Sequence, residues 1–187
     1  MTPTPTPTHA LNPPVATAPR KPTWRFLLAH PAHAIALGFG SGLAPIAPGT
    51  AGTLWAWAAF LVLQPHLSDR QWAWLLVGGA LVGWWACTVA ARNLAVADPG
   101  SIVWDEVLAF WLVLWLVMPG GFWAQLWAFA LFRFFDAAKP GPVAWADALF
   151  KGKRGAPIGW AQGFGIIFDD LVAALCTLVV IALWRWL

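Results

Sequence analysis

The sequence predicts an all-α, polytopic membrane protein with four to five helices that span the membrane or lie against it. Of its 187 residues, 60% are hydrophobic and only 10% are charged, and the mean hydropathy is +0.66. Soluble domains of this size rarely have such a composition. The chain has sixteen tryptophans and no tyrosine, and tryptophan collects at bilayer interfaces. Backbone in lipid must satisfy its own hydrogen bonds, so helices are expected rather than open sheets.

The chain begins with a Pro/Thr-rich stretch, residues 1–25, which we expect to be a disordered tail. This stretch lacks the apolar run of a signal peptide. Residues 26–187 form the predicted helical membrane domain. Its first part, residues 26–37, is mildly apolar and is interrupted at His30-Pro31, so we expect it to lie along the membrane surface.

Five apolar segments follow, and each approaches the length needed to cross a hydrocarbon core of about 30 Å. They cover residues 49–64, 72–89, 102–118, 122–135 and 166–187, of which the first and fourth are short. Turns rich in glycine, proline and polar residues separate the segments. We expect a tight turn at residues 118–121 and a long Gly/Pro-rich loop over residues 140–165.

The basic residues divide unequally if every segment crosses the membrane once. One side receives most of them, namely Arg20, Lys21, Arg25, Arg92, Lys151, Lys153 and Arg154. The other side receives Arg70 and Arg185. The positive-inside rule therefore makes the first side cytoplasmic.

Asp69 in the 64–71 turn and Asp98 in the 91–101 loop are expected to be simply solvated, and the other six acidic residues all fall on the predicted cytoplasmic side: Asp105, Glu106, Asp136, Asp147, Asp169 and Asp170. Asp105-Glu106 begins the third segment, Asp136 closes the fourth, and Asp169-Asp170 opens the fifth. A lone Asp at a helix start is usually a cap. Carboxylates from three segments that converge at membrane depth indicate a functional site instead. We expect this site at the cytoplasmic ends of the helices.

The chemistry of the acidic residues favours Mg²⁺ as the cofactor. Carboxylates gathered without His or Cys suit a hard divalent cation, and Mg²⁺ usually bridges to a substrate phosphate. Arg133, Asp136 and Lys139 recur every three residues, so they share roughly one face of a helix. Pro140 is expected to end this helix. Arg133 and Lys139 either bind a phosphate beside the metal, or extend toward the membrane surface and pair with Asp136 without a ligand.

A glycine-rich stretch, residues 38–53, lies just before the first apolar segment. Successive N–H groups in such a stretch can form an anion-binding nest, although this one has no Walker A lysine. A re-entrant turn without a ligand is an equally good interpretation. The candidate phosphate-binding residues here are Gly40, Ser41, Gly42, Gly49 and Thr50, and Thr53 is an alternative to Thr50 near the helix start.

Four stretches of the chain, "GFGSGLAPIAPGTAGTL", "GSIVWDEVLAFW", "LFRFFDAAKPGPV" and "GFGIIFDDLVAAL", occur in the order seen in the phosphatidylglycerophosphatase A family. The chain strongly resembles that family over residues 35–180. The resemblance implies a Mg²⁺-dependent lipid phosphatase of the bacterial inner membrane that converts phosphatidylglycerophosphate to phosphatidylglycerol and inorganic phosphate. Gly141 and Ala109 depart from the residues common in the family, and neither departure removes a charged group.

The resemblance places the acidic motif positions on Asp105, Glu106, Asp136, Asp169 and Asp170, and the basic ones on Arg133 and Lys139. Our hypothesis is that Asp105, Glu106, Asp169 and Asp170 bind Mg²⁺. Asp136 then completes the metal shell or orients a water molecule, and Arg133 and Lys139 bind the phosphate.

The expected partners are the lipid substrate and the bilayer, with no nucleic acid, and the expected location is multi-pass in the inner membrane with the site facing the cytoplasm. The alternative is a small membrane transporter or channel with a carboxylate-lined cation site. Transporters tend to place such charges near the midplane rather than at helix ends.

Overall fold

The computed structural model describes residues 21–151 and 157–186 of the chain. All regular structure in this part is helical, which confirms the predicted all-α class. The elements are α1 (Trp24–Ala29), α2 (Pro31–Ala36), the 3-10 segment η1 (Gly38–Leu43), α3 (Pro48–Leu63), the 3-10 turn η2 (Gln64–His66), α4 (Asp69–Leu94), α5 (Trp104–Val117), α6 (Phe122–Ala138), α7 (Pro142–Leu149) and α8 (Trp160–Trp186). Most of the expected tail, residues 1–20, lies outside the described residues, and Trp24 and Arg25 already belong to α1.

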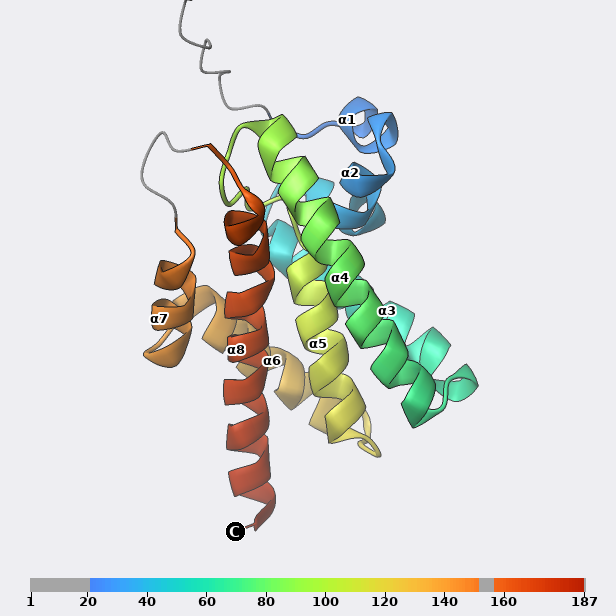
Figure 1. Cartoon of the computed structure of the whole chain (residues 1–187). Helices are drawn as coiled ribbons and strands as arrows, with labels where there is room; N and C mark the ends of the chain where they lie inside the picture. The colour runs from blue at the N-terminus through green and yellow to red at the C-terminus, as the bar shows by residue number, and fades with distance from the viewer. Residues whose placement is uncertain (1–20, 152–156, 187) are drawn as a thin grey trace, which may run out of the picture.

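Helix α5 lies in the middle of the bundle, with α4 on one side and α8 on the other (Figure 1). It packs against α3, α4, α6 and α8, and most of its side chains are buried. The short helices α1 and α2 cover one end of the bundle, next to the start of α5. The end of α5, the start of α4 and the C-terminus of α8 form the opposite end, so the molecule has two distinct ends joined by apolar helices.

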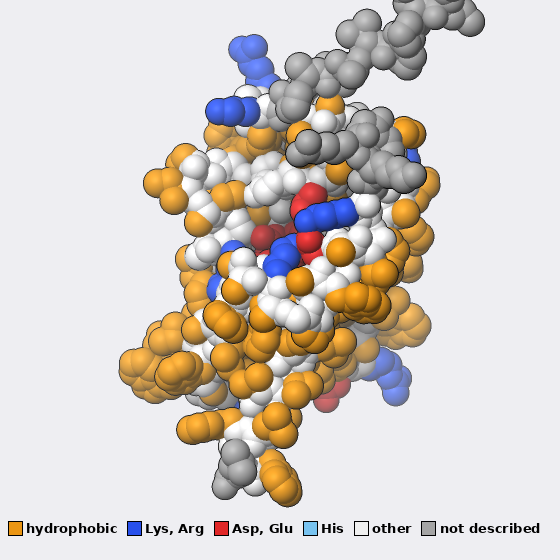
Figure 2. All heavy atoms as spheres, turned by 90° about the vertical axis from the view of Figure 1, so that its left-hand side faces the viewer, with side chains coloured by type: hydrophobic (Ala, Val, Ile, Leu, Met, Phe, Trp, Pro, Cys, Tyr) orange, Lys and Arg blue, Asp and Glu red, His pale blue; other side chains and the backbone are white. Residues whose placement is uncertain are grey.

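Two helices are long and apolar enough to cross a membrane: α4, with 26 residues, and α8, with 27 residues; an 18-residue stretch of each has a mean hydropathy of 1.6 and 2.5, respectively. Helices α3, α5 and α6 have 16, 14 and 17 residues, fewer than the about 20 that a perpendicular crossing needs. Hydrophobic side chains also cover much of the face that Figure 2 shows, and together with the two apolar helices they indicate membrane association. The predicted count of four to five spans is therefore not confirmed.

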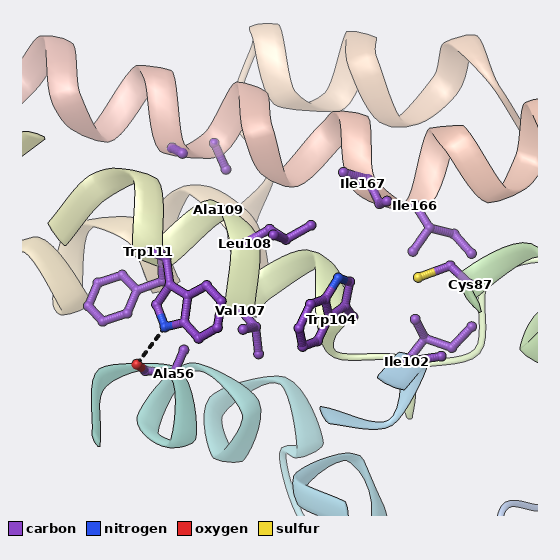
Figure 3. Packing of buried hydrophobic residues seen from close by; sticks show 14 of the residues in the cluster. Ala56, Cys87, Ile102, Trp104, Val107, Leu108, Ala109, Trp111, Ile166 and Ile167 are labelled. Carbon is purple, nitrogen blue, oxygen red and sulfur yellow. Dashed lines mark hydrogen bonds between the residues drawn. The ribbon is translucent and has the colours of Figure 1, made fainter. Parts of the chain in front are cut away.

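The side chains of α5 form the centre of the core. Figure 3 shows them between α3 on one side and α8 on the other. The indole Nε1 of Trp111 donates a hydrogen bond to the carbonyl oxygen of Ala56, 2.8 Å away, which ties α5 to α3. The ring of Trp104 lies so close to Gly83 of α4 that any Cβ at that position would overlap it. The absence of a side chain at Gly83 thus sets the close approach of α4 to α5.

Replacing Trp111 with phenylalanine is expected to lower the stability of the protein by about 1 kcal/mol, because the hydrogen bond to Ala56 is lost in a dry core. The measurement is the thermal unfolding temperature in detergent. Trp123→Phe is the matched control, since Trp123 is 71% exposed and has no such role. Equal unfolding temperatures for the two variants would contradict the assigned packing role.

The interruption predicted at His30-Pro31 is confirmed, since α1 ends at Ala29 and α2 begins at Pro31. The His30 side chain accepts the N–H of Ala32 at 3.1 Å and so caps α2. In the next turn, His33 stacks on Phe26 and lies 2.8 Å from the amide of Asn93 in α4. Burial lowers the pKa of His33, so a neutral imidazole links these helices.

The prediction of a long loop over residues 140–165 is wrong in two respects. Helix α7 occupies its first part, and α8 begins at Trp160 rather than at residue 166. Gly141, with φ of 47°, allows the sharp turn out of α6, and Pro142 stands at the first helical position, where its missing N–H costs nothing. As a consequence, Asp169 and Asp170 do not open α8 but lie more than two turns inside it.

Candidate functional site

Three carboxylates from two helices meet near the start of α5. Asp105 and Glu106 lie in its first turn, and Asp170 comes from the facing side of α8. One ligand oxygen from each lies within 4.8 Å of the others. The three residues are 8%, 8% and 3% exposed, so this group, which we call the carboxylate centre, is buried between the two helices.

The carboxylate centre contains oxygens that have no hydrogen-bond partner among the described residues. They are Asp105 Oδ1, Glu106 Oε2 and Asp170 Oδ2, and Asp169 Oδ1 is in the same condition. Burial of a charged oxygen without a partner costs several kcal/mol or more. A divalent cation would supply the partner, and an all-oxygen donor set suits a hard metal ion. The carboxylate centre can therefore hold a metal ion.

Arg133 and Asp136 lie beside the carboxylate centre, in the last two turns of α6. They form an ion pair across one helical turn, in agreement with the shared face predicted from their spacing. The guanidinium Nη1 of Arg133 is also 3.8 Å from Oε1 of Glu106, and Asp136 is an acidic neighbour of Asp170. Arg133 thus links α6 to the carboxylate centre.

Lys139 follows the end of α6 in a left-handed conformation, with φ of 44°. Its Nζ donates to Oδ1 of Asp147 in α7 at 2.7 Å and also forms an ion pair with Asp169. Asp147 pairs with Lys151 as well. Asp169 therefore lies outside the carboxylate centre and is held by Lys139, and its assignment as a metal ligand stays a prediction.

These contacts fix the charges of the Lys139 and Asp147 pair. Burial lowers the pKa of Lys139, but the hydrogen bonds to Asp147 and Asp169 outweigh it and leave the pKa above its usual range. Burial likewise raises the pKa of Asp147, but its bonds from Lys139 and Lys151 leave the pKa below its usual range. Both groups are therefore charged over the physiological pH range, which favours a fixed position for the ammonium.

For the phosphatase activity that the family resemblance implies, replacing Asp147 with asparagine is expected to lower the catalytic efficiency by about tenfold, because a group that orients a functional side chain typically contributes this much. The effect should fall mainly on KM, since Lys139 would lose one of its two carboxylate partners. Lys151→Gln removes the exposed partner of Asp147 and is the matched control. Asp147→Glu should restore part of the loss, and equal kinetics for Asp147→Asn and Lys151→Gln would rule out the positioning role.

Gly49 lies against the carboxylate centre. A Cβ at this position would overlap Oε1 of Glu106 and come within 3.2 Å of Nη2 of Arg133. One turn later in α3, Thr53 donates to the carbonyl oxygen of Gly49 at 2.8 Å and accepts from Nη1 of Arg133 at 3.4 Å. The start of α3 is therefore a wall of the site, and Thr53 rather than Thr50 contacts the arginine.

The other predicted phosphate-binding residues lie in η1 and in the first turn of α3. Gly40 faces α1, and Gly42 faces the segment that precedes α5. The Ser41 hydroxyl donates within η1, to the carbonyl oxygen of Gly38 at 2.9 Å. Thr50 follows Gly49 and is half-buried. A phosphate-binding role for Gly40, Ser41, Gly42 and Thr50 stays a prediction.

Acidic and basic side chains gather at one place on the molecular surface, above a broad band of hydrophobic side chains (Figure 2). Asp147, Lys151 and Asp169 line a small pocket between α7, α8 and the segment after α4. The charged side chains thus lie next to an apolar surface on the face that Figure 2 shows.

The helical domain that carries these residues matches a known family. The family model described as "Phosphatidylglycerophosphatase A" matches residues 34–185. The chain belongs to the phosphatidylglycerophosphatase A family. No solved structure matches the chain.

Two bacterial relatives are named for the same family. A phosphatidylglycerophosphatase A of Escherichia coli strain K12 is 37% identical over 152 residues, which cover 81% of each chain. A phosphatidylglycerophosphatase A of Haemophilus influenzae is 36% identical over 168 residues, which cover 89% of this chain and 96% of the relative. The match thus extends over nearly the whole helical domain of this chain.

Proposed function

We propose that this chain hydrolyses phosphatidylglycerophosphate to phosphatidylglycerol and inorganic phosphate, as a step of phospholipid biosynthesis, and that it does so with Mg²⁺. Membership of the phosphatidylglycerophosphatase A family supports the reaction. The observation that carries the metal dependence is the set of buried carboxylate oxygens without a partner at the carboxylate centre.

Asp105, Glu106 and Asp170 would hold the metal ion, and Asp169 would add a further oxygen from the next position of α8. A bound Mg²⁺ neutralises phosphoryl oxygens and lowers the pKa of a coordinated water molecule. Asp136, whose position is fixed by its ion pair with Arg133, would complete the metal shell or orient the attacking water. The overall reaction consumes one water molecule and breaks the phosphomonoester bond.

Arg133 and Lys139 would bind the phosphate from two directions. The guanidinium of Arg133 lies beside Glu106 and Asp136. Its planar set of N–H donors matches the oxygens of a phosphate. Lys139 approaches from the side of α7, where Asp147 holds its ammonium. Two cations in these positions would stabilise the charge that grows on the phosphoryl group and the leaving oxygen.

The membrane arrangement that fits this reaction is multi-pass in the bacterial inner membrane, with the site on the cytoplasmic side. Arg25, Arg92 and Lys151 lie at the end of the molecule that carries the site, whereas Arg70 and Arg185 lie at the opposite end. This distribution favours a cytoplasmic site. The phosphomonoester of a membrane lipid sits at headgroup level, so a site at this height would reach it without extraction of the lipid.

The test is phosphate release by the purified full-length protein in detergent. Phosphatidylglycerophosphate, phosphatidic acid and a water-soluble phosphomonoester are each supplied with Mg²⁺ or with a chelator. We expect rapid release from phosphatidylglycerophosphate with Mg²⁺ and at least about a hundredfold less with the chelator. An absence of release from all three substrates with Mg²⁺ would refute the enzyme, and full release with the chelator would refute the metal dependence alone.

A further inference from the structure

An apolar cleft lies at the end of the molecule opposite the carboxylate centre, between α6 and α8. Its volume is about 510 Å³, within the range of about 300–1,000 Å³ that is common for ligand sites. The walls consist of Ala124, Trp127 and Leu131 from α6, and of Val180, Trp184 and Arg185 from α8. Apart from the arginine, these residues present hydrocarbon and aromatic surface to the cleft.

Arg185 is the single charged residue among the described residues that line the cleft. Its Nη2 donates to the carbonyl oxygen of Val117 at 2.8 Å, a bond that satisfies a free carbonyl at the C-terminus of α5. A guanidinium has five N–H groups, so this bond leaves most of them for other acceptors. No carboxylate in the described part of the chain forms an ion pair with Arg185.

The position of Arg185 separates this cleft from the site at the other end. Arg185 follows Asp170 by fifteen residues within the same helix, which corresponds to about 22 Å along the helix axis. This distance covers most of the hydrocarbon core of a bilayer, which is about 30 Å thick. Asp69, which accepts a hydrogen bond from Trp115 at 3.1 Å, marks the same end of the bundle at the start of α4. A headgroup at Arg185 would therefore belong to the leaflet away from the carboxylate centre.

We propose that this cleft binds a phospholipid with an anionic headgroup from that leaflet. The headgroup phosphate contacts the guanidinium of Arg185, because arginine binds phosphate oxygens through paired hydrogen bonds. One acyl chain lies along Trp127 and Leu131, and the indole of Trp184 sits at the interface, where tryptophan is enriched. The lipid is separate from the substrate, and its binding does not depend on the reaction proposed above.

The combination of a cation and an apolar cleft favours a lipid over a second copy of the chain. A second copy would have to place a carboxylate or carbonyl group against Arg185 inside an apolar interface. An anionic phospholipid carries the required charge and the required chain in one molecule. The lipid would also link the ends of α5, α6 and α8, which meet at this cleft.

Native mass spectrometry of the full-length protein in mild detergent, after incubation with phosphatidylglycerol, tests the proposal. Arg185→Gln removes the charge, and Ala124→Trp fills the cleft while Arg185 stays in place. Arg70→Gln is the matched control, because Arg70 lies at the same end of the bundle but does not line the cleft. We expect the wild type and the control to retain one lipid, and the two cleft variants to retain about tenfold less, a difference of about 1.4 kcal/mol.

Three results would overturn the proposal. Retention by both cleft variants at the level of Arg70→Gln would show that the lipid binds elsewhere. Equal retention of phosphatidylcholine would remove the role of the net negative charge. A second copy of the chain would be identified as the occupant if the wild type were a dimer without bound lipid and Ala124→Trp were a monomer. If Arg185→Gln does not fold, the comparison of Ala124→Trp with Arg70→Gln decides the outcome by itself.

Discussion

The Asp170→Asn variant is expected to release phosphate from phosphatidylglycerophosphate about a thousandfold more slowly than the wild type, because loss of about 4 kcal/mol of transition-state stabilisation changes a rate by this factor. The substitution keeps the shape of the side chain but removes one of the three charges that we propose as metal ligands. The measurement is kcat with saturating Mg²⁺. Asp69→Asn, at the opposite end of the bundle, is the matched control and should stay within about twofold of the wild type.

The same variant also gives a result that does not depend on activity. Three buried carboxylates repel one another without a cation, so Mg²⁺ should raise the unfolding temperature of the wild type. It should not raise that of Asp170→Asn, which lacks a complete set of ligands. An equal gain in unfolding temperature for Asp170→Asn and Asp69→Asn would show that Mg²⁺ acts elsewhere, even if the activity of Asp170→Asn is low.

The Gly49→Ala variant is expected to lose about a hundredfold in kcat/KM, because a displacement of about 1 Å in a catalytic group can cost this much. The added methyl group would overlap Oε1 of Glu106 and press on the guanidinium of Arg133. Both groups would move away from the start of α3, so the proposed metal ligand Glu106 and the proposed phosphate ligand Arg133 would be displaced together.

Gly78→Ala in α4 is the matched control, because nothing lies within 4 Å of a Cβ at that position. It should leave activity unchanged and slightly favour the helix, since alanine has a higher helix propensity than glycine. Wild-type activity in Gly49→Ala would mean that Glu106 and Arg133 do not act from the positions described. Equal loss in both variants would point to a general effect of the substitution.

The helices could be predicted from the sequence because their apolar runs and their turn residues agree. The interruption at His30-Pro31 and the end of α6 before Pro140 follow from proline chemistry alone. The loop expected over residues 140–165 shows the limit of this reasoning. Glycine and proline were interpreted there as loop residues, although Gly141 and Pro142 instead turn the chain and begin α7.

The residues of the carboxylate centre could be predicted because acidic residues are rare in this chain and expensive at membrane depth. The different contacts that these residues make could not be predicted. Asp169 and Asp170 are adjacent, yet their side chains point from α8 in different directions, one toward Lys139 and the other toward α5. The contact of Thr53 with Arg133 was only weakly indicated by the sequence, through the position of Thr53 one turn after Gly49. The contact of Asp147 with Lys139 was not indicated, because it depends on α7, a helix that was not expected.

Asp105, Glu106 and Asp170 are proposed to bind the divalent cation that the lipid phosphatase reaction uses. Electron paramagnetic resonance of Mn²⁺, as a stand-in for Mg²⁺, measures this binding directly in the purified protein. Saturable Mn²⁺ binding by the wild type and by Asp69→Asn is expected, with displacement by Mg²⁺ and affinity at least about a hundredfold weaker in Asp170→Asn. Unchanged Mn²⁺ affinity in Asp170→Asn would contradict the claim.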